Sequence, residues 1–178
     1  MTIVKWDKWT QKRYGQEMSY ILGMDWLKSC KLVEDWGCSL CYAKKFRQGD
    51  YRGIDGTAGK ADVVADLSTY KSDTPGLFMR AVLCHNYDWR DILQNALDSF
   101  TERMFLMIYR PLQAKQKVII PKNPVELDLP RDELVAMVKP YLVFESRVEP
   151  SAHGHEVIFF LEKKVVAKKL VEPTPWVG

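Results

Sequence analysis

The chain has 178 residues, 47% of them hydrophobic, which is enough for one domain with a substantial core. Its 26 basic and 23 acidic residues leave a formal charge of +3, without the concentrated basic face that a nucleic-acid-binding protein needs. No stretch approaches the roughly 20 apolar residues that cross a bilayer, and no signal peptide or disulfide framework is visible, so we expect a cytoplasmic protein with reduced thiols.

The first half of the chain alternates helices with short apolar strands. Met18, Ile21 and Leu22 recur at helical spacing within the first 30 or so residues. An apolar strand is expected at residues 31–35, followed by a helix at residues 40–48. Three more strands are expected at residues 51–55, 62–67 and 77–84.

The clearest helix covers residues 89–100, where apolar and polar side chains fall on opposite faces. Asp88 is placed to cap the N terminus of this helix. The unbroken apolar run at residues 104–109 predicts a strand that is covered on both sides, and Pro111 ends it.

The last third of the chain combines an irregular segment, a helix and two strands. Residues 111–128 contain one possible short strand, KVII. A helix is expected at residues 130–138, with proline in its first turn. The strands expected at residues 141–148 and 156–162 form an antiparallel pair. Five strands with intervening helices, followed by this hairpin, predict an α/β fold with a mixed sheet.

The turn after the first strand, DWGCSLC at residues 35–41, carries the first chemical signal. In open α/β folds, such a turn holds nucleotide-like ligands against the carboxyl ends of the strands. Dinucleotide-binding turns contain three glycines, so that a pyrophosphate can approach a helix N terminus. Only Gly37 is present here, which argues against a pyrophosphate and therefore against a nicotinamide-dependent enzyme.

Acidic residues end three successive predicted strands, namely Asp35, Asp55 and Asp66. Asp55 can accept both hydroxyls of a ribose, and the three acids together can hold a ribose, an adenine and an amino group. Buried without such a ligand, three carboxylates at one edge would be costly. The alternative is that each aspartate caps the helix that follows it.

These segments resemble class I S-adenosylmethionine-dependent methyltransferases. LVEDWGCSLC is similar to the nucleotide-binding turn V-L-D-x-G-C-G-x-G of that family, and YRGID and ADVVADL resemble its second- and third-strand signatures. RAVLCHNYDWRDILQNALDSF is similar to the fourth-strand segment of small members with a VLEHN-x-x-W stretch. The resemblance covers residues 30–112 or so.

The sequence departs from the family pattern in four places. Ser39 and Cys41 replace two glycines of the turn, and Cys84 replaces the usual glutamate of the fourth-strand segment. Too few residues join Asp55 to Asp62 for a regular crossover helix. Either the second helix is a mere turn, or one of the two flanking strands is misplaced. The acid usual at the start of the fourth strand is also absent.

The resemblance implies a Rossmann-like methyltransferase fold, with a mostly parallel sheet of about seven strands, a C-terminal antiparallel hairpin and helices on both faces. It implies one domain over residues 1–178. Within this domain, residues 1–30 form a helical segment and lid, residues 31–112 the cofactor-binding half, and residues 113–178 the C-terminal half.

The resemblance also implies a site for S-adenosylmethionine, with Gly37 by the methionine portion, Asp55 on the ribose and Asp66 near the adenine. The full set of expected cofactor contacts is Asp35, Gly37, Cys38, Ser39, Asp55, Gly56, Asp66, Leu67 and Cys84. The expected acceptor contacts are Trp9, Tyr14, Asn86, Trp89 and Arg110. For Arg110, surface exposure is an equal alternative. The aromatic residues of the N-terminal segment form a lid over the site or pack a terminal helix.

His85 is the candidate catalytic base, because a neutral imidazole can take a proton from a substrate hydroxyl. The alternative is that His85 orders its loop through a hydrogen bond. Cys38 and Cys41 form a C-x-x-C pair, but no second pair completes a zinc site, and we expect no metal. Cys38 is better interpreted as a small turn residue.

The expected function is therefore methyl transfer from S-adenosylmethionine to a small-molecule or sugar-type acceptor. The lost glycines leave a non-catalytic binding module as an alternative, and an NAD(P)-dependent oxidoreductase is a weaker one. The Asn/Asp-Pro-Pro-aromatic signature of DNA amine methylation is missing, so a nucleic acid is not an expected partner, and without a long apolar stretch neither is a membrane. The sequence leaves the acceptor and the oligomeric state open.

Overall fold

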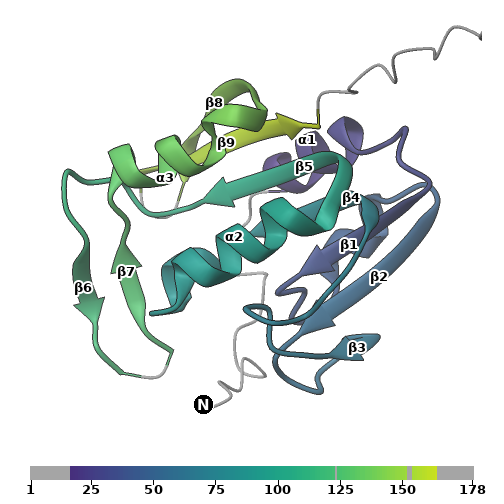
Figure 1. Ribbon diagram of the computed structural model, residues 1–178, viewed down its shortest axis with the longest axis horizontal. Helices are drawn as coiled ribbons and strands as arrows, with labels where there is room; N and C mark the ends of the chain where they lie inside the picture. The colour runs from purple at the N-terminus through teal and green to yellow at the C-terminus, as the bar shows by residue number, and fades with distance from the viewer. Residues whose placement is uncertain (1–16, 123, 152–153, 164–178) are drawn as a thin grey trace, which may run out of the picture.

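The computed structural model describes residues 17–122, 124–151 and 154–163. Its main feature is a seven-stranded sheet in the order β3-β2-β1-β4-β5-β9-β8 (Figure 1). The strands are β1 (Leu32–Trp36), β2 (Asp50–Asp55), β3 (Val63–Val64), β4 (Thr74–Arg80), β5 (Phe100–Ile108), β8 (Leu142–Ser151) and β9 (Gly154–Glu162).

Strand direction divides the sheet into two parts. The five strands β3, β2, β1, β4 and β5 are mutually parallel, whereas β9 runs antiparallel to both β5 and β8. The predicted mixed sheet with a closing antiparallel hairpin is thus confirmed. Because the parallel strands share one direction, their carboxyl ends meet at a single edge, which we call the carboxyl edge.

Helices cover both faces of the sheet (Figure 1). Helix α1 (Met18–Trp26) lies on one face, and α2 (Trp89–Ser99) and α3 (Arg131–Val138) lie on the other. Side chains alternate along β5, so that Leu106 packs towards α2 and Phe105 packs towards α1. We call these the α2 face and the α1 face.

Each face has its own hydrophobic core. The α2-face core joins Trp36, Leu77, Trp89 and Phe159 among its buried members. The α1-face core is smaller and is rich in aromatic rings, with Phe78 stacked on Phe105 at a centroid distance of 5.1 Å. No helix in the described ranges is long and apolar enough to cross a membrane.

Two predicted elements end earlier than the sequence pattern indicates. The helix expected at residues 40–48 is a short 3-10 helix, η2 (Tyr42–Phe46), because Cys41 has a φ of 53° and cannot belong to a right-handed helix. The strand expected at residues 77–84 stops at Arg80, since Ala81 has a φ of 59°. Cys84 and His85 therefore lie in a 3-10 turn, η3 (Leu83–His85).

The link between the second and third strands settles an alternative left open by the sequence. Residues 56–62 form bends and no helix, and β2 still pairs with β3 in parallel, although β3 covers only part of the strand expected at residues 62–67. The prediction that Asp88 caps helix α2 was wrong. Asp88 occupies the N-cap position, but its side chain makes no capping hydrogen bond to α2.

The segment after β5 contains more structure than the sequence indicates. Strands β6 (Lys117–Ile120) and β7 (Glu126–Asp128) form a separate antiparallel pair, and β7 was missed. Helix α3 begins at Arg131, one residue after Pro130, which occupies the N-cap position instead of the first turn.

Candidate active site

Backbone strain in the described residues is confined to the carboxyl edge. The non-glycine residues with positive φ there are Ser39 (49°), Cys41 (53°) and Ala81 (59°). The first two belong to the turn after β1, and the third follows β4, the neighbouring strand. Such conformations cost on the order of 1–3 kcal/mol each and concentrate at binding and catalytic sites, so this edge is the candidate site.

Gly37 fixes the start of the turn after β1. It has a φ of 77°, and its N–H donates to the Ile54 carbonyl at 2.7 Å. A Cβ at this position would lie 2.4 Å from Val82 Cγ2, so a side chain would collide with the segment that follows β4. Ser39 and Cys41, which replace glycines of the family pattern, still take the left-handed conformation that glycine favours.

Asp55 closes the turn from the end of β2. Its Oδ2 accepts from the Ser39 N–H at 2.8 Å, and its Oδ1 accepts from the N–H and the hydroxyl of Thr57, both at 2.9 Å. A carboxylate offers about four lone-pair positions, so this arrangement leaves about one for a ligand hydroxyl. The sequence alone predicted that Asp55 could accept from two ribose hydroxyls. The sequence does not show that the turn already occupies most of the lone-pair positions of this carboxylate.

The next strand brings Asp66 to the same edge. Asp66 Oδ1 accepts from the N–H of Ser68 at 2.9 Å and from its hydroxyl at 2.8 Å, so the aspartate orders its own turn. A Cβ on Gly56 would lie 3.9 Å from the Ala65 carbonyl oxygen, which places the ends of β2 and β3 side by side. The predicted contacts Asp55, Gly56, Asp66 and Leu67 are thus neighbours.

Asp35, at the end of β1, is buried on the α1 face. The Tyr51 hydroxyl donates to its Oδ2 at 2.5 Å. The pKa of Asp35 is raised to about 7, mainly because the carboxyl is buried. The hydrogen bond from Tyr51 and the charge of Arg80 lower this pKa, whereas the charge of Asp55 raises it. Asp35 therefore changes its charge near neutral pH.

The two cysteines of the turn lie close together as free thiols. Their sulfur atoms are 3.4 Å apart, and the Cys41 thiol also donates to the Lys60 carbonyl at 3.1 Å. Gly53 makes room for both, because a Cβ there would lie within 2.8 Å of each sulfur. Burial raises the pKa of Cys38 and of Cys41, so neither is an activated thiolate. The described residues hold no group of three metal-ligating side chains.

His85 has the loop-ordering contact that was the alternative to a catalytic role. Its Nδ1 lies 3.0 Å from the Val125 carbonyl oxygen, and its ring stacks on Tyr109 at 5.3 Å between centroids. Because a carbonyl can only accept, Nδ1 carries the proton and Nε2 carries the lone pair in the neutral ring. The contact fixes the ring without removing its basic nitrogen, so both interpretations stand.

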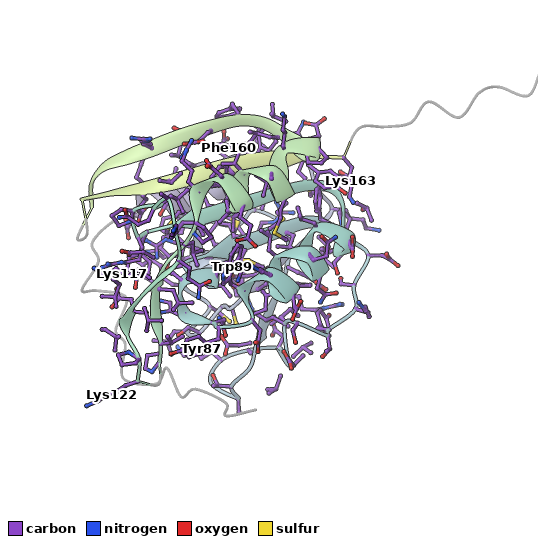
Figure 2. The ribbon with its side chains drawn as sticks, turned by 60° about the vertical axis from the view of Figure 1, so that its left-hand side comes forward. Tyr87, Trp89, Lys117, Lys122, Phe160 and Lys163 are labelled. Atoms are coloured by element: carbon purple, nitrogen blue, oxygen red, sulfur yellow. The ribbon has the colours of Figure 1, made fainter. Side chains whose placement is uncertain are left out.

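The structure gives several predicted contact residues a packing role. Trp89 is fully buried in the α2-face core and donates through Nε1 to Gln116 at 3.0 Å; Figure 2 shows it at the centre of the molecule. Arg110 is not surface-exposed, since it pairs with Asp128 at 2.8 Å and with Glu126 at 3.4 Å. The ion pairs of Arg110 attach β7 to the segment that follows β5, and the predicted acceptor contacts of Trp89 and Arg110 stay predictions.

Two other predicted contacts, one fully buried and one half-buried, are held by neighbouring groups of the protein. Cys84 is fully buried in the α1-face core, and Asn86 Nδ2 donates to the Val82 carbonyl at 2.8 Å. Trp9 and Tyr14 lie outside the described residues, so their predicted acceptor contacts stay predictions.

Sequence reasoning missed two charged residues on the α1 face, Arg80 and Glu156. The only signal in the sequence is that each is a single charge within or beside an apolar strand run, LFMRAVLC for Arg80 and EVIFFL for Glu156. That signal does not indicate that the two side chains meet. Arg80 Nη2 and Glu156 Oε1 lie 2.6 Å apart, although the residues are separated by 76 positions in the chain.

Solved structures, two of them named as methyltransferases, share this fold. The N1-methyltransferase of 1,6-didemethyltoxoflavin from Burkholderia thailandensis aligns with a TM-score of 0.65 at 14% identity, over 82% of this chain and 76% of that one. Magnesium protoporphyrin IX methyltransferase from Synechocystis gives 0.60 at 13% identity, over 84% of each chain. The N-terminal domain of EvdMO1, solved with S-adenosylhomocysteine and D-fucose, gives 0.61 at 12% identity, over 82% and 81%.

These comparisons confirm the Rossmann-like methyltransferase fold, and with it, at the level of fold, the resemblance found in the sequence. No protein-family model matches the chain, and no curated protein matches it in sequence. The fold is therefore established by structure, while the chemistry has to be argued from the site.

Proposed function

We propose that the chain is an S-adenosylmethionine-dependent methyltransferase that acts on a small molecule. The observation that carries the proposal is the left-handed turn after β1, which folds onto Asp55 at the end of β2. It occurs in a fold shared with structures that hold S-adenosylhomocysteine. The turn keeps the backbone form of a nucleotide-binding turn even where its glycines are replaced.

The residues at the carboxyl edge fit such a cofactor. S-adenosylmethionine, when bound, supplies a methyl group already activated on a sulfonium, so the protein contributes mainly alignment and exclusion of water. Asp55 would accept from a ribose hydroxyl with its remaining lone pair, and the backbone of the turn would lie along the methionine portion. Asp66 would stand near the adenine. The roles of these residues remain predictions.

A general base is needed only for an acceptor of low acidity, and His85 is the candidate. Its Nδ1–H is held by the Val125 carbonyl, so the tautomer with a basic Nε2 is the one that the structure favours. An acceptor that already carries a nucleophilic lone pair needs no such group.

A small acceptor is supported by what related folds bind. The three structures compared above act on or were solved with a didemethyltoxoflavin, a magnesium porphyrin and a fucose. A cytoplasmic location is a further prediction, consistent with the four free cysteines among the described residues.

Isothermal titration with S-adenosylhomocysteine tests the proposal. Asp55→Asn should weaken binding about tenfold or more, because a charge-assisted hydrogen bond to the ribose is lost. Asp98→Asn, a change on the exposed side of α2, should leave binding unaltered. Absence of heat with both S-adenosylmethionine and S-adenosylhomocysteine would overturn the proposal. Binding with the methyl group intact after incubation with many acceptors would favour the non-catalytic module.

A further inference from the structure

A cluster of buried polar groups lies on the α1 face at the carboxyl edge, beside the turn after β1. We call it the Arg80 cluster, and its members are Ser19, Tyr20, Asp35, Arg80 and Glu156. Strand register places the three charges on one face. Asp35 pairs with Phe78, Arg80 pairs with Met107, and Met107 in turn pairs with Ile158, two residues after Glu156.

Arg80 is the centre of the cluster. Its Nη2 donates to Glu156 Oε1 at 2.6 Å, and its Nε donates to the Ser19 hydroxyl at 2.9 Å. Its guanidinium carbon lies 4.5 Å from the centroid of the Tyr20 ring. The Arg80 and Glu156 side chains are 12% and 3% exposed, so the pair is held away from bulk water by contacts from α1, β4 and β9.

One oxygen of the cluster has no hydrogen-bond partner among the residues that the structure describes. Glu156 Oε2 is buried, and no hydrogen-bond donor among the described residues reaches it. A buried carboxylate oxygen without a donor is costly, and native proteins keep few such groups. An unsatisfied buried acceptor beside a candidate cofactor site is expected where a ligand supplies the missing donor.

The charges of the cluster indicate what that ligand carries. Glu156 pairs with the Arg80 guanidinium, and Asp35 adds a second carboxylate nearby when it is ionised. Both carboxyl groups act on Tyr20, whose pKa is raised to about 12 mainly by burial, with Arg80 lowering it and Asp35 and Glu156 raising it. With Asp35 ionised, the cluster carries one more negative than positive charge, which favours a hydrogen-bond donor or a cation and disfavours a carboxylate.

The position of the cluster links it to the acceptor. Asp35 stands two residues before Gly37, and Arg80 directly precedes Ala81, so both left-handed turns of the carboxyl edge begin at the cluster. We propose that the Arg80 cluster is the polar subsite for the methyl acceptor, and that Glu156 Oε2 accepts a hydrogen bond from an N–H group of a small amine. This inference rests on the proposed function and narrows its substrate class.

The test uses the full chain saturated with S-adenosylhomocysteine, titrated with matched probes. Benzylamine, tyramine and histamine are compared with benzoate, 4-hydroxyphenylacetate and imidazole-4-acetate by calorimetry and by thermal shift. At least one amine should bind, and its matched acid should not. Glu156→Gln should weaken that amine about tenfold or more, because a charge-assisted hydrogen bond is lost, and should leave the affinity for S-adenosylhomocysteine within about twofold.

Two further variants keep the test decisive. Glu162→Gln, on the same strand but 43% exposed, is the matched control and should bind the amine like the wild type. Glu156→Asp keeps a carboxylate beside Arg80, so the fold is preserved. Because aspartate is shorter by one methylene group, its carboxylate oxygens lie farther from the proposed amine. It should weaken the amine by a smaller factor than Glu156→Gln. Retained binding of S-adenosylhomocysteine reports that each variant is folded.

The outcomes separate this inference from the proposed function. No binding of S-adenosylhomocysteine by the wild type overturns the proposed function and the inference with it. Cofactor binding without any amine binding, or tighter binding of the acids, overturns the inference alone. A Glu156→Gln variant that loses affinity for S-adenosylhomocysteine instead of the amine also overturns it, because Glu156 would then serve the ammonium group of the cofactor.

Discussion

The two faces of the sheet bury acidic side chains in different ways. On the α2 face, Glu34 accepts from Trp36 Nε1 at 3.0 Å through one oxygen, and from Tyr70 and Arg52 at 3.3 and 3.4 Å through the other. On the α1 face, Glu156 pairs with Arg80 through one oxygen and leaves the other without a donor among the described residues.

The difference separates a face whose acid is fully hydrogen-bonded from one whose acid is not, and the proposed acceptor subsite lies on the second. The α2 face combines a large apolar core with a fully satisfied acid, so its side chains serve packing. The α1 face, near the carboxyl edge, holds unbalanced charges and left-handed backbone, both of which lower stability in the free protein. Four sets of variants test this contrast between the two faces.

Trp89→Ala on the α2 face should have the largest effect. Trp89 is fully buried, and truncation of such a side chain removes about 3–5 kcal/mol from the free energy of unfolding. Urea denaturation measures the loss, with Tyr87→Ala as the control, because Tyr87 is 53% exposed and should change stability by less than about 0.5 kcal/mol. Equal effects of the two variants would contradict the packing role of Trp89.

Asp35 should make stability depend on pH. Its carboxyl ionises near pH 3.8 when unfolded and near pH 7 when folded, so the folded state holds the proton more tightly. Its contribution is full below about pH 4 and is lost as the pH rises through 7. At about 1.4 kcal/mol per pKa unit, the change approaches about 4 kcal/mol. Asp35→Asn should remove this slope from urea titrations at several pH values, and an unchanged slope would refute the assignment.

Arg80→Met should lower the free energy of unfolding by about 3 kcal/mol, because it leaves the Glu156 carboxylate buried without its counter-charge. The double variant Arg80→Met, Glu156→Leu should recover most of this loss, because an apolar pair replaces both charges. Amine binding should be abolished in both variants. A double variant as unstable as the single one would mean that the ion pair serves stability.

Ser39→Gly and Cys41→Gly should have the smallest effects, each raising the free energy of unfolding by about 0.5 kcal/mol. Relief of a left-handed conformation gains about 1–2 kcal/mol, and the added freedom of the unfolded chain offsets part of this gain. Ala43→Gly in η2 is the opposite control and should destabilise by about 1 kcal/mol. Thermal and urea unfolding both report whether each variant raises or lowers the free energy of unfolding. Destabilisation by Ser39→Gly would show that the left-handed conformation of Ser39 is not strained.

The strands of the sheet were predictable because their signal is local. The apolar run that ends at Asp35 and the apolar run at residues 104–109 identify buried strands whatever their neighbours are. The places where prediction failed are backbone reversals. Nothing in the composition of residues 77–84 shows that Ala81 takes a left-handed conformation and ends β4, because the N–H of Ala81 bonds to the Met107 carbonyl of the neighbouring strand.

The candidate site was predictable only in part, for the same reason. Acids at the ends of parallel strands must meet at one edge, so Asp35, Asp55 and Asp66 could be grouped from sequence spacing. The full burial of Trp89 could not be predicted, because an aromatic residue beside a loop has the same sequence signature whether it faces a ligand or a core.

The sequence by itself determined the strand ends and the glycine turn, since these follow from hydrophobic period and from the conformational freedom of Gly37. The tertiary structure alone decided how the charges meet. Arg80 and Glu156 come together only because β9 enters the sheet antiparallel beside β5, and Asp35 joins them only because β1 lies against β4. Side-chain chemistry is encoded residue by residue, but the distances that turn it into a site arise from strand order.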